Sequence, residues 1–210
     1  MSNAQFRPQS IPAAREFVRQ LPPPSAAPFI VVNDYTPATE REEILNALAD
    51  EGAQTKTVRT MARWTLEQLT LRLRRAPSDL EFAQALLDTI HALVEYGDDP
   101  EPVEQYSRAV TSLMPVEGMP VSPITGKPKG RGDCDDLAVL FSALARAAGL
   151  NSDVIWVDQP GADYNHVAAV LCQGRGEQCY WVETTIPGAK VGETTAEVMR
   201  RLRVTGRKDI

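Results

Sequence analysis

The chain has 210 residues, 43% of them hydrophobic and 24% charged, which is typical of a globular protein with one domain and at most an extra lobe. Its 28 acidic residues outnumber its 22 basic ones, and the net charge of −6 argues against nucleic acid or anionic membrane surfaces as partners. Neither a run of roughly 20 apolar residues nor an N-terminal secretory signal is present, so we expect a cytoplasmic protein without membrane insertion.

The N-terminal segment, residues 1–28, is rich in proline and shows little periodicity. Such a composition predicts an extended arm, with at most a short helix over 13–20. The apolar run at 29–32 that follows predicts an edge strand.

Two helices are predicted after this strand. Thr36 and Pro37 are a favourable N-cap and first helical residue, and Gly52 is a typical stop signal. A second helix, in which apolar residues alternate with several arginines, is predicted over 58–75. We therefore expect an N-terminal helical region over 29–76.

The next helix has the clearest start signal of the chain. Ser78 and Glu81 have the spacing of a capping box, and apolar residues at helical spacing follow over 79–96. Another short helix is predicted over 103–113. Prolines and glycines dominate 115–130, which predicts a loop leading to the helix that begins at Cys134.

The periodicity changes from helical to strand-like after Gly149, where the Cys134 helix should end. A terminal helix is predicted over 193–203, followed by a tail over 204–210. The predicted strands, of which the last two should form a hairpin, cover 153–157, 166–172 and 178–184.

Three cysteines are too few for a disulfide framework. With a turn at 174–177, Cys172 and Cys179 should face each other across the hairpin. They are either two small, half-buried residues or a cross-strand disulfide, and the sequence leaves both readings open. A zinc site is not expected, because the chain has no Cys-x-x-Cys pair.

The same hairpin register places a histidine next to an acid. If Cys172 faces Cys179, then His166 and Glu183 lie diagonally across the two strands on one sheet face, with roughly 7–8 Å between their backbones. A thiol at a helix N-terminus, a histidine and a carboxylate are what nucleophilic cysteine chemistry needs. Cys134, His166 and Glu183 are therefore the predicted nucleophile, base and orienting acid, although the register does not place Cys134 against the other two.

Three carboxylates surround this thiol: Asp133, Asp135 and Asp136. Asp133 is a suitable N-cap, and the other two could simply complement the helix dipole. Negative charge raises the pKa of a nearby thiol, so we expect a source of positive charge that offsets the three carboxylates. A calcium ion held by the three aspartates could supply it, as could Lys129, Arg131 and the helix dipole.

The strings GDCDDLAVLFSALARAAGL, NHVAAVL and YWVETT resemble the transglutaminase-like superfamily, in particular bacterial transglutaminase-like cysteine proteinases and phage-encoded transglutaminase-like proteins. The resemblance maps the nucleophile motif onto Gly132 to Asp136, the histidine onto His166, and the third member, usually Asp, onto Glu183. It implies a papain-like α+β domain over 77–203, with the Cys helix packed on an antiparallel sheet. Calcium beside the nucleophile, at Asp133, Asp135 and Asp136, is also implied.

Two functions are expected from these observations. The first is a cysteine peptidase-type hydrolase that acts on a protein or peptide substrate, needs no cofactor, and has calcium as its one candidate ion. Amide cross-linking would use the same acyl-enzyme. The alternative is a non-catalytic structural or assembly protein, for example a virion-associated phage component that binds other phage structural proteins. The proline-rich arm favours this alternative.

Overall fold

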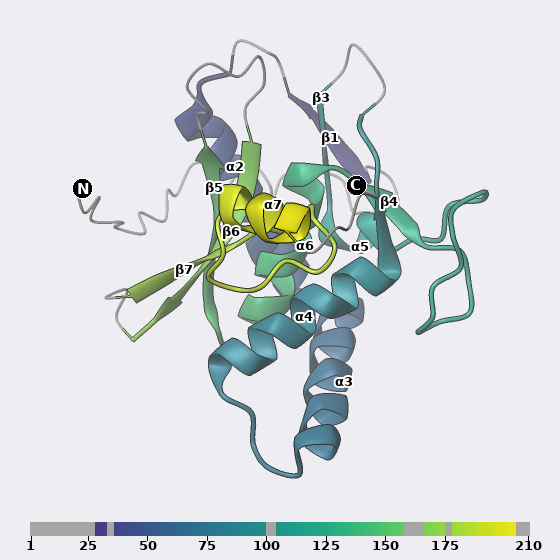
Figure 1. The fold of residues 1–210 in the computed structure, drawn as a ribbon. Coiled ribbons are helices and arrows are strands. Elements are labelled where there is room, and N and C mark those ends of the chain that lie inside the picture. Colours follow the sequence, from purple (N-terminus) through teal and green to yellow (C-terminus); the bar gives the residue numbers. More distant parts are fainter. Residues whose placement is uncertain (1–27, 33–35, 100–103, 158–165, 175–177, 205–210) are drawn as a thin grey trace.

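The fold combines helices with small sheets (Figure 1). Among the described residues of this computed structural model are six helices and three sheets of two or three strands, which confirms the predicted α+β class. The predicted helix over 13–20 lies outside the described part, as do the arm before residue 28 and the tail from 205. The structure describes residues 28–32, 36–99, 104–157, 166–174 and 178–204.

Gly52 does not end the first helix as predicted. Helix α2, Ala38–Gln54, continues through Gly52, and α3, Lys56–Leu73, follows almost directly. A Cβ atom at Gly52 would lie 2.8 Å from the Cβ of Ala109 and 2.9 Å from that of Ala143. The glycine therefore serves close packing between helices instead of helix termination.

Helix α4, Asp79–Leu93, begins with the predicted capping box. The backbone N–H of Glu81 donates to Ser78 Oγ at 3.3 Å, and the N–H of Ser78 donates to Glu81 Oε2 at 2.8 Å. The helix ends three residues before the predicted boundary. Val94–Tyr96 instead forms strand β2, which pairs in parallel with β4, Gly130–Gly132.

The predicted helix over 103–113 is largely wrong. Its first half is strand β3, Glu104–Ser107, which pairs antiparallel with the predicted edge strand β1, Phe29–Val32. A single short helix, α5, Ala109–Ser112, remains. Tyr106 in β3 is fully buried, and its pairing with a distant strand overrides the local helical preference.

The centre of the fold is helix α6, Cys134–Ala147, which packs against α2 and against two strands of the main sheet. This antiparallel sheet has the order β5 (Asn151–Val157), β6 (His166–Gln173) and β7 (Gln178–Val182), as predicted apart from the strand ends. Helix α7, Thr195–Val204, follows it. The side chains of β6 that join the main core are Val167, Ala169 and Leu171.

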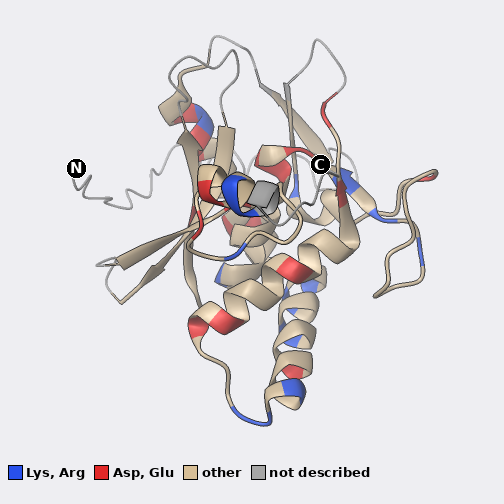
Figure 2. Ribbon diagram, viewed as in Figure 1, with Lys and Arg blue, Asp and Glu red and all other residues tan. Residues whose placement is uncertain are grey.

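Charge is distributed unevenly over the helices (Figure 2). Although the chain is acidic, α3 carries four basic residues and one acidic residue. Acidic residues are visible at the start of α6, where three aspartates follow Gly132. None of the described helices is long and apolar enough to cross a membrane.

Cys172 and Cys179, which face each other across the β6–β7 hairpin, form a disulfide. We expect reduction to lower the free energy of unfolding by about 2 kcal/mol, because the bond closes a short loop in the unfolded chain. Urea denaturation with and without dithiothreitol measures this difference. The double variant Cys172→Ala/Cys179→Ala should not respond to the reductant. An equal response of wild type and variant would contradict the prediction.

Candidate active site

Cys134 is the first residue of α6, is half-buried, and takes no part in a disulfide. The predicted N-cap is confirmed, because Asp133 Oδ1 accepts a hydrogen bond from the Asp136 N–H at 3.4 Å. A Cβ atom at Gly132 would lie 2.8 Å from the Cβ of Asp136, so only glycine lets β4 turn this closely into the helix. The helix dipole places partial positive charge at this N-terminus, which favours the thiolate form of Cys134.

His166 and Glu183 meet at the ends of β6 and β7. The predicted hairpin register is confirmed, since Ala169 pairs with Val182 and Cys172 with Cys179. His166 Nε2 lies 3.0 Å from Glu183 Oε2, and both side chains are buried, with Glu183 fully inaccessible. The structure thus brings together two of the three predicted site residues. The contact between the Cys134 sulfur and the imidazole stays a prediction.

The contact with Glu183 occupies one ring nitrogen of His166 and leaves the other for a second hydrogen-bond partner. Glu183 is an ionised acceptor, so His166 Nε2 carries the proton of this hydrogen bond. The second ring nitrogen, Nδ1, is then the basic one. A ring held in this orientation can present Nδ1 to a thiol for proton transfer.

Glu183 is held by more than the histidine. Its Oε1 accepts hydrogen bonds from the Thr185 N–H at 3.1 Å and from Thr185 Oγ1 at 2.7 Å, and its Oε2 accepts one from Thr195 Oγ1. Burial by itself raises the pKa of Glu183, but the hydrogen bond and charge of His166, together with the threonine hydroxyls, lower it to about 2. These contacts also fix a side chain one methylene longer than the aspartate that the resemblance implies.

Sequence reasoning missed both threonines and the other histidine of the chain. Thr185, two residues after Glu183, could have been found, because a hydroxyl at this spacing often bonds back to a nearby acid. Thr195 lies across a loop at the start of α7, and His91 lies on α4. His91 Nε2 lies 2.9 Å from the Thr184 carbonyl oxygen, and burial lowers the pKa of His91, so the neutral ring donates.

Lys129 and Arg131, which we considered as charge compensation for the aspartates, have other contacts. Lys129 Nζ lies 2.9 Å from Glu95 Oε2 and donates to the His91 carbonyl at 3.0 Å. Arg131 Nη2 donates to the Asp98 carbonyl at 2.5 Å. Their hydrogen bonds support the β2–β4 pairing and the end of α4.

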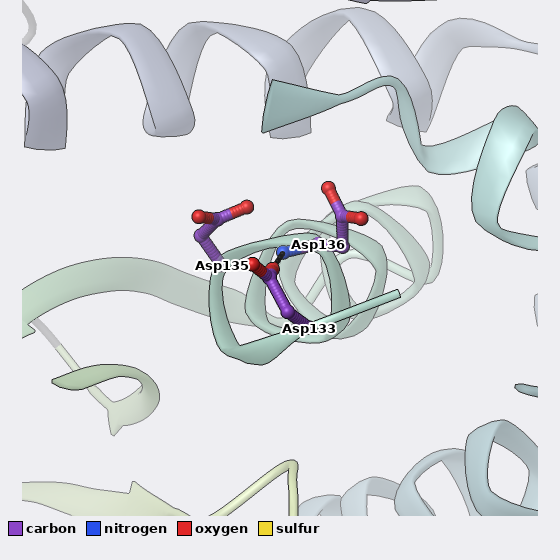
Figure 3. Close-up of side chains that lie close together, drawn as sticks. All are labelled: Asp133, Asp135 and Asp136. Carbon is purple, nitrogen blue, oxygen red and sulfur yellow. Dashed lines mark hydrogen bonds between the residues drawn. The ribbon is translucent and has the colours of Figure 1, made fainter. Parts of the chain in front are cut away.

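Figure 3 shows Asp133, Asp135 and Asp136 around the first turn of α6. One carboxylate oxygen atom from each of the three lies within 4.8 Å of the other two. Calcium binds six to eight oxygen atoms at about 2.3–2.6 Å, so the three carboxylates suit part of such a site. Asp136 also has a structural contact, because its Oδ1 accepts the Ser107 N–H at 2.6 Å. Burial, followed by the charge of Asp133, raises the pKa of Asp136 to about 8.

The family model described as the transglutaminase-like superfamily matches residues 67–198, a span that contains Cys134, His166 and Glu183. No curated protein and no solved structure matches the chain.

Proposed function

Because the chain belongs to the transglutaminase-like superfamily, we propose that it is a thiol-dependent acyl-transfer enzyme. Cys134 is the nucleophile, His166 the general base and later the general acid, and Glu183 the residue that orients the imidazole. The observation that carries this proposal is the buried hydrogen bond between His166 Nε2 and Glu183 Oε2 at 3.0 Å. It leaves Nδ1 as the basic nitrogen for a thiol.

The first half of the reaction forms an acyl-enzyme. The Cys134 thiol gives its proton to His166 Nδ1, and the sulfur attacks the carbonyl carbon of an amide substrate. Backbone N–H groups at the start of α6 stabilise the oxyanion that develops. The imidazolium then donates its proton to the leaving nitrogen, the C–N bond breaks, and a thioester with Cys134 remains.

The second half decides between hydrolysis and transfer. A water molecule that gives a proton to His166 attacks the thioester, and the products are a carboxylic acid and the free thiol. We favour this peptidase-type outcome on peptide or isopeptide bonds. An amine in place of water would give a new amide from the same intermediate, so product mass distinguishes the two.

Alkylation by iodoacetamide tests whether Cys134 is activated. We expect Cys134 to react at least about tenfold faster than glutathione near neutral pH, since the helix N-terminus and His166 favour the thiolate. Peptide mass spectrometry after short exposure measures each thiol, and prior reduction makes Cys172 and Cys179 available as internal controls. Equal rates for the three thiols would reject the proposal and favour the alternative, a non-catalytic structural or assembly role.

Calcium is the second element of the proposal. Asp133, Asp135 and Asp136 would hold the ion, which would offset the negative charge around Cys134. Millimolar calcium should raise the Tm by several degrees, because a ligand that binds only the folded state stabilises it. Asp135→Asn should reduce this shift, and magnesium should not reproduce it. A calorimetric titration without binding heat at millimolar calcium would reject the site.

A further inference from the structure

A pocket of about 290 Å³ lies between the main sheet and the start of α7. This volume is at the small end for ligand sites and suits one large side chain. Six described residues line the pocket: Val157, Trp181, Thr194, Thr195, Ala196 and Met199.

The pocket shares its walls with the candidate active site. Val157, at the end of β5, is the direct cross-strand neighbour of His166. Trp181 precedes Glu183 by two residues on the hairpin, so its side chain is on the sheet face that carries the His–Glu pair. Thr195 both lines the pocket and donates its hydroxyl hydrogen to Glu183 Oε2. An occupant would therefore lie against the residues that hold the acid.

The chemistry of the walls selects an uncharged occupant. None of the six described lining residues is charged, and a buried charge without a partner is costly. Trp181 adds one specific feature. Its indole nitrogen is buried and has no hydrogen-bond partner among the described residues. Buried N–H groups without an acceptor are rare in folded proteins. A hydrogen-bond acceptor on a ligand would supply the missing partner of this N–H.

We propose that this pocket binds an uncharged, apolar side chain of the acyl substrate, and that the adjacent substrate carbonyl accepts a hydrogen bond from Trp181 Nε1. The pocket thus provides substrate specificity next to the His166–Glu183 pair. Its assignment to the acyl substrate rests on the proposed function, whereas its preference for an apolar side chain does not.

Binding to the full chain can be measured without turnover. We expect titration with N-acetyl-leucinamide to shift the Trp181 indole N–H signal in ¹⁵N–¹H correlation spectra, with N-acetyl-glycinamide binding about tenfold or more weakly. Trp181→Phe assigns the signal. Iodoacetamide labelling of Cys134 in the same sample reports on the proposed function separately. If iodoacetamide labels Cys134 selectively but the two amides bind with equal affinity, the subsite is rejected and the proposed function is not.

Two pairs of variants localise the site. Ala196→Leu fills the pocket and should weaken N-acetyl-leucinamide binding about tenfold, whereas Ala85→Leu, in the separate pocket between α3 and α4, should not. Trp181→Phe keeps an aromatic wall but removes the N–H, with Trp64→Phe of the other pocket as its control. If each control variant weakened binding as much as the variant it is matched to, the subsite would be rejected. Unchanged affinity in Trp181→Phe would reject the carbonyl contact.

Discussion

Replacing His166 with alanine should slow acylation of Cys134 by about 100- to 10,000-fold near neutral pH. The imidazole is the group that would take the thiol proton, and positioned general bases contribute accelerations of this size. Acylation can be followed with p-nitrophenyl acetate, by nitrophenolate release and by the mass of the acetylated protein. Cys134→Ala should abolish the acetylation that remains at this position.

The other histidine provides the matched control. His91 donates to the Thr184 carbonyl, and His91→Gln retains an N–H donor for this contact. This variant should keep most of the acylation rate, because His91 has a supporting contact to the backbone and no assigned role in proton transfer. If His91→Gln were as slow as His166→Ala, the assignment of His166 as the base would be wrong.

Ionisation of Glu183 should make the stability of the fold depend on pH in the acidic range. Its pKa is about 2 in the folded protein and 4.5 ordinarily, so the folded state stabilises the ionised form. The resulting contribution of about 3 kcal/mol is fully present above about pH 4.5 and is lost as the pH falls through about 2. Urea denaturation of wild type and Glu183→Gln at about pH 6 and about pH 2 measures it. The difference between the two proteins should shrink on acidification.

Glu193→Gln is the control for this measurement. The pKa of Glu193 is also lowered, first of all by its hydrogen bond with Arg201, which lies 2.7 Å away. This pair is screened by solvent and should contribute far less to stability than the buried pair. A loss in Glu183→Gln no larger than that in Glu193→Gln, at both pH values, would show that the buried His166–Glu183 pair does not stabilise the fold.

The main elements of the site follow from short-range signals in the sequence. Asp133 caps α6 because its side chain reaches the N–H three residues further on, and Ser78 caps α4 in the same way. The His166–Glu183 contact follows from the hairpin register, since side chains alternate along a strand with a period of two. Such features need only the geometry of one helix turn or one hairpin, so the residues alone determined them.

Only the tertiary structure decided the contacts between segments that are distant in the sequence. The pairing of Tyr106 with Ile30 made a strand of a predicted helix, and close packing kept Gly52 inside a helix. Thr195 meets Glu183 across 12 residues, and His91 meets Thr184 across 93. No local pattern marks these contacts. They arise because burial of apolar surface selects which helices and strands pack together, and hydrogen bonds then form between the polar groups that the packing brings into reach.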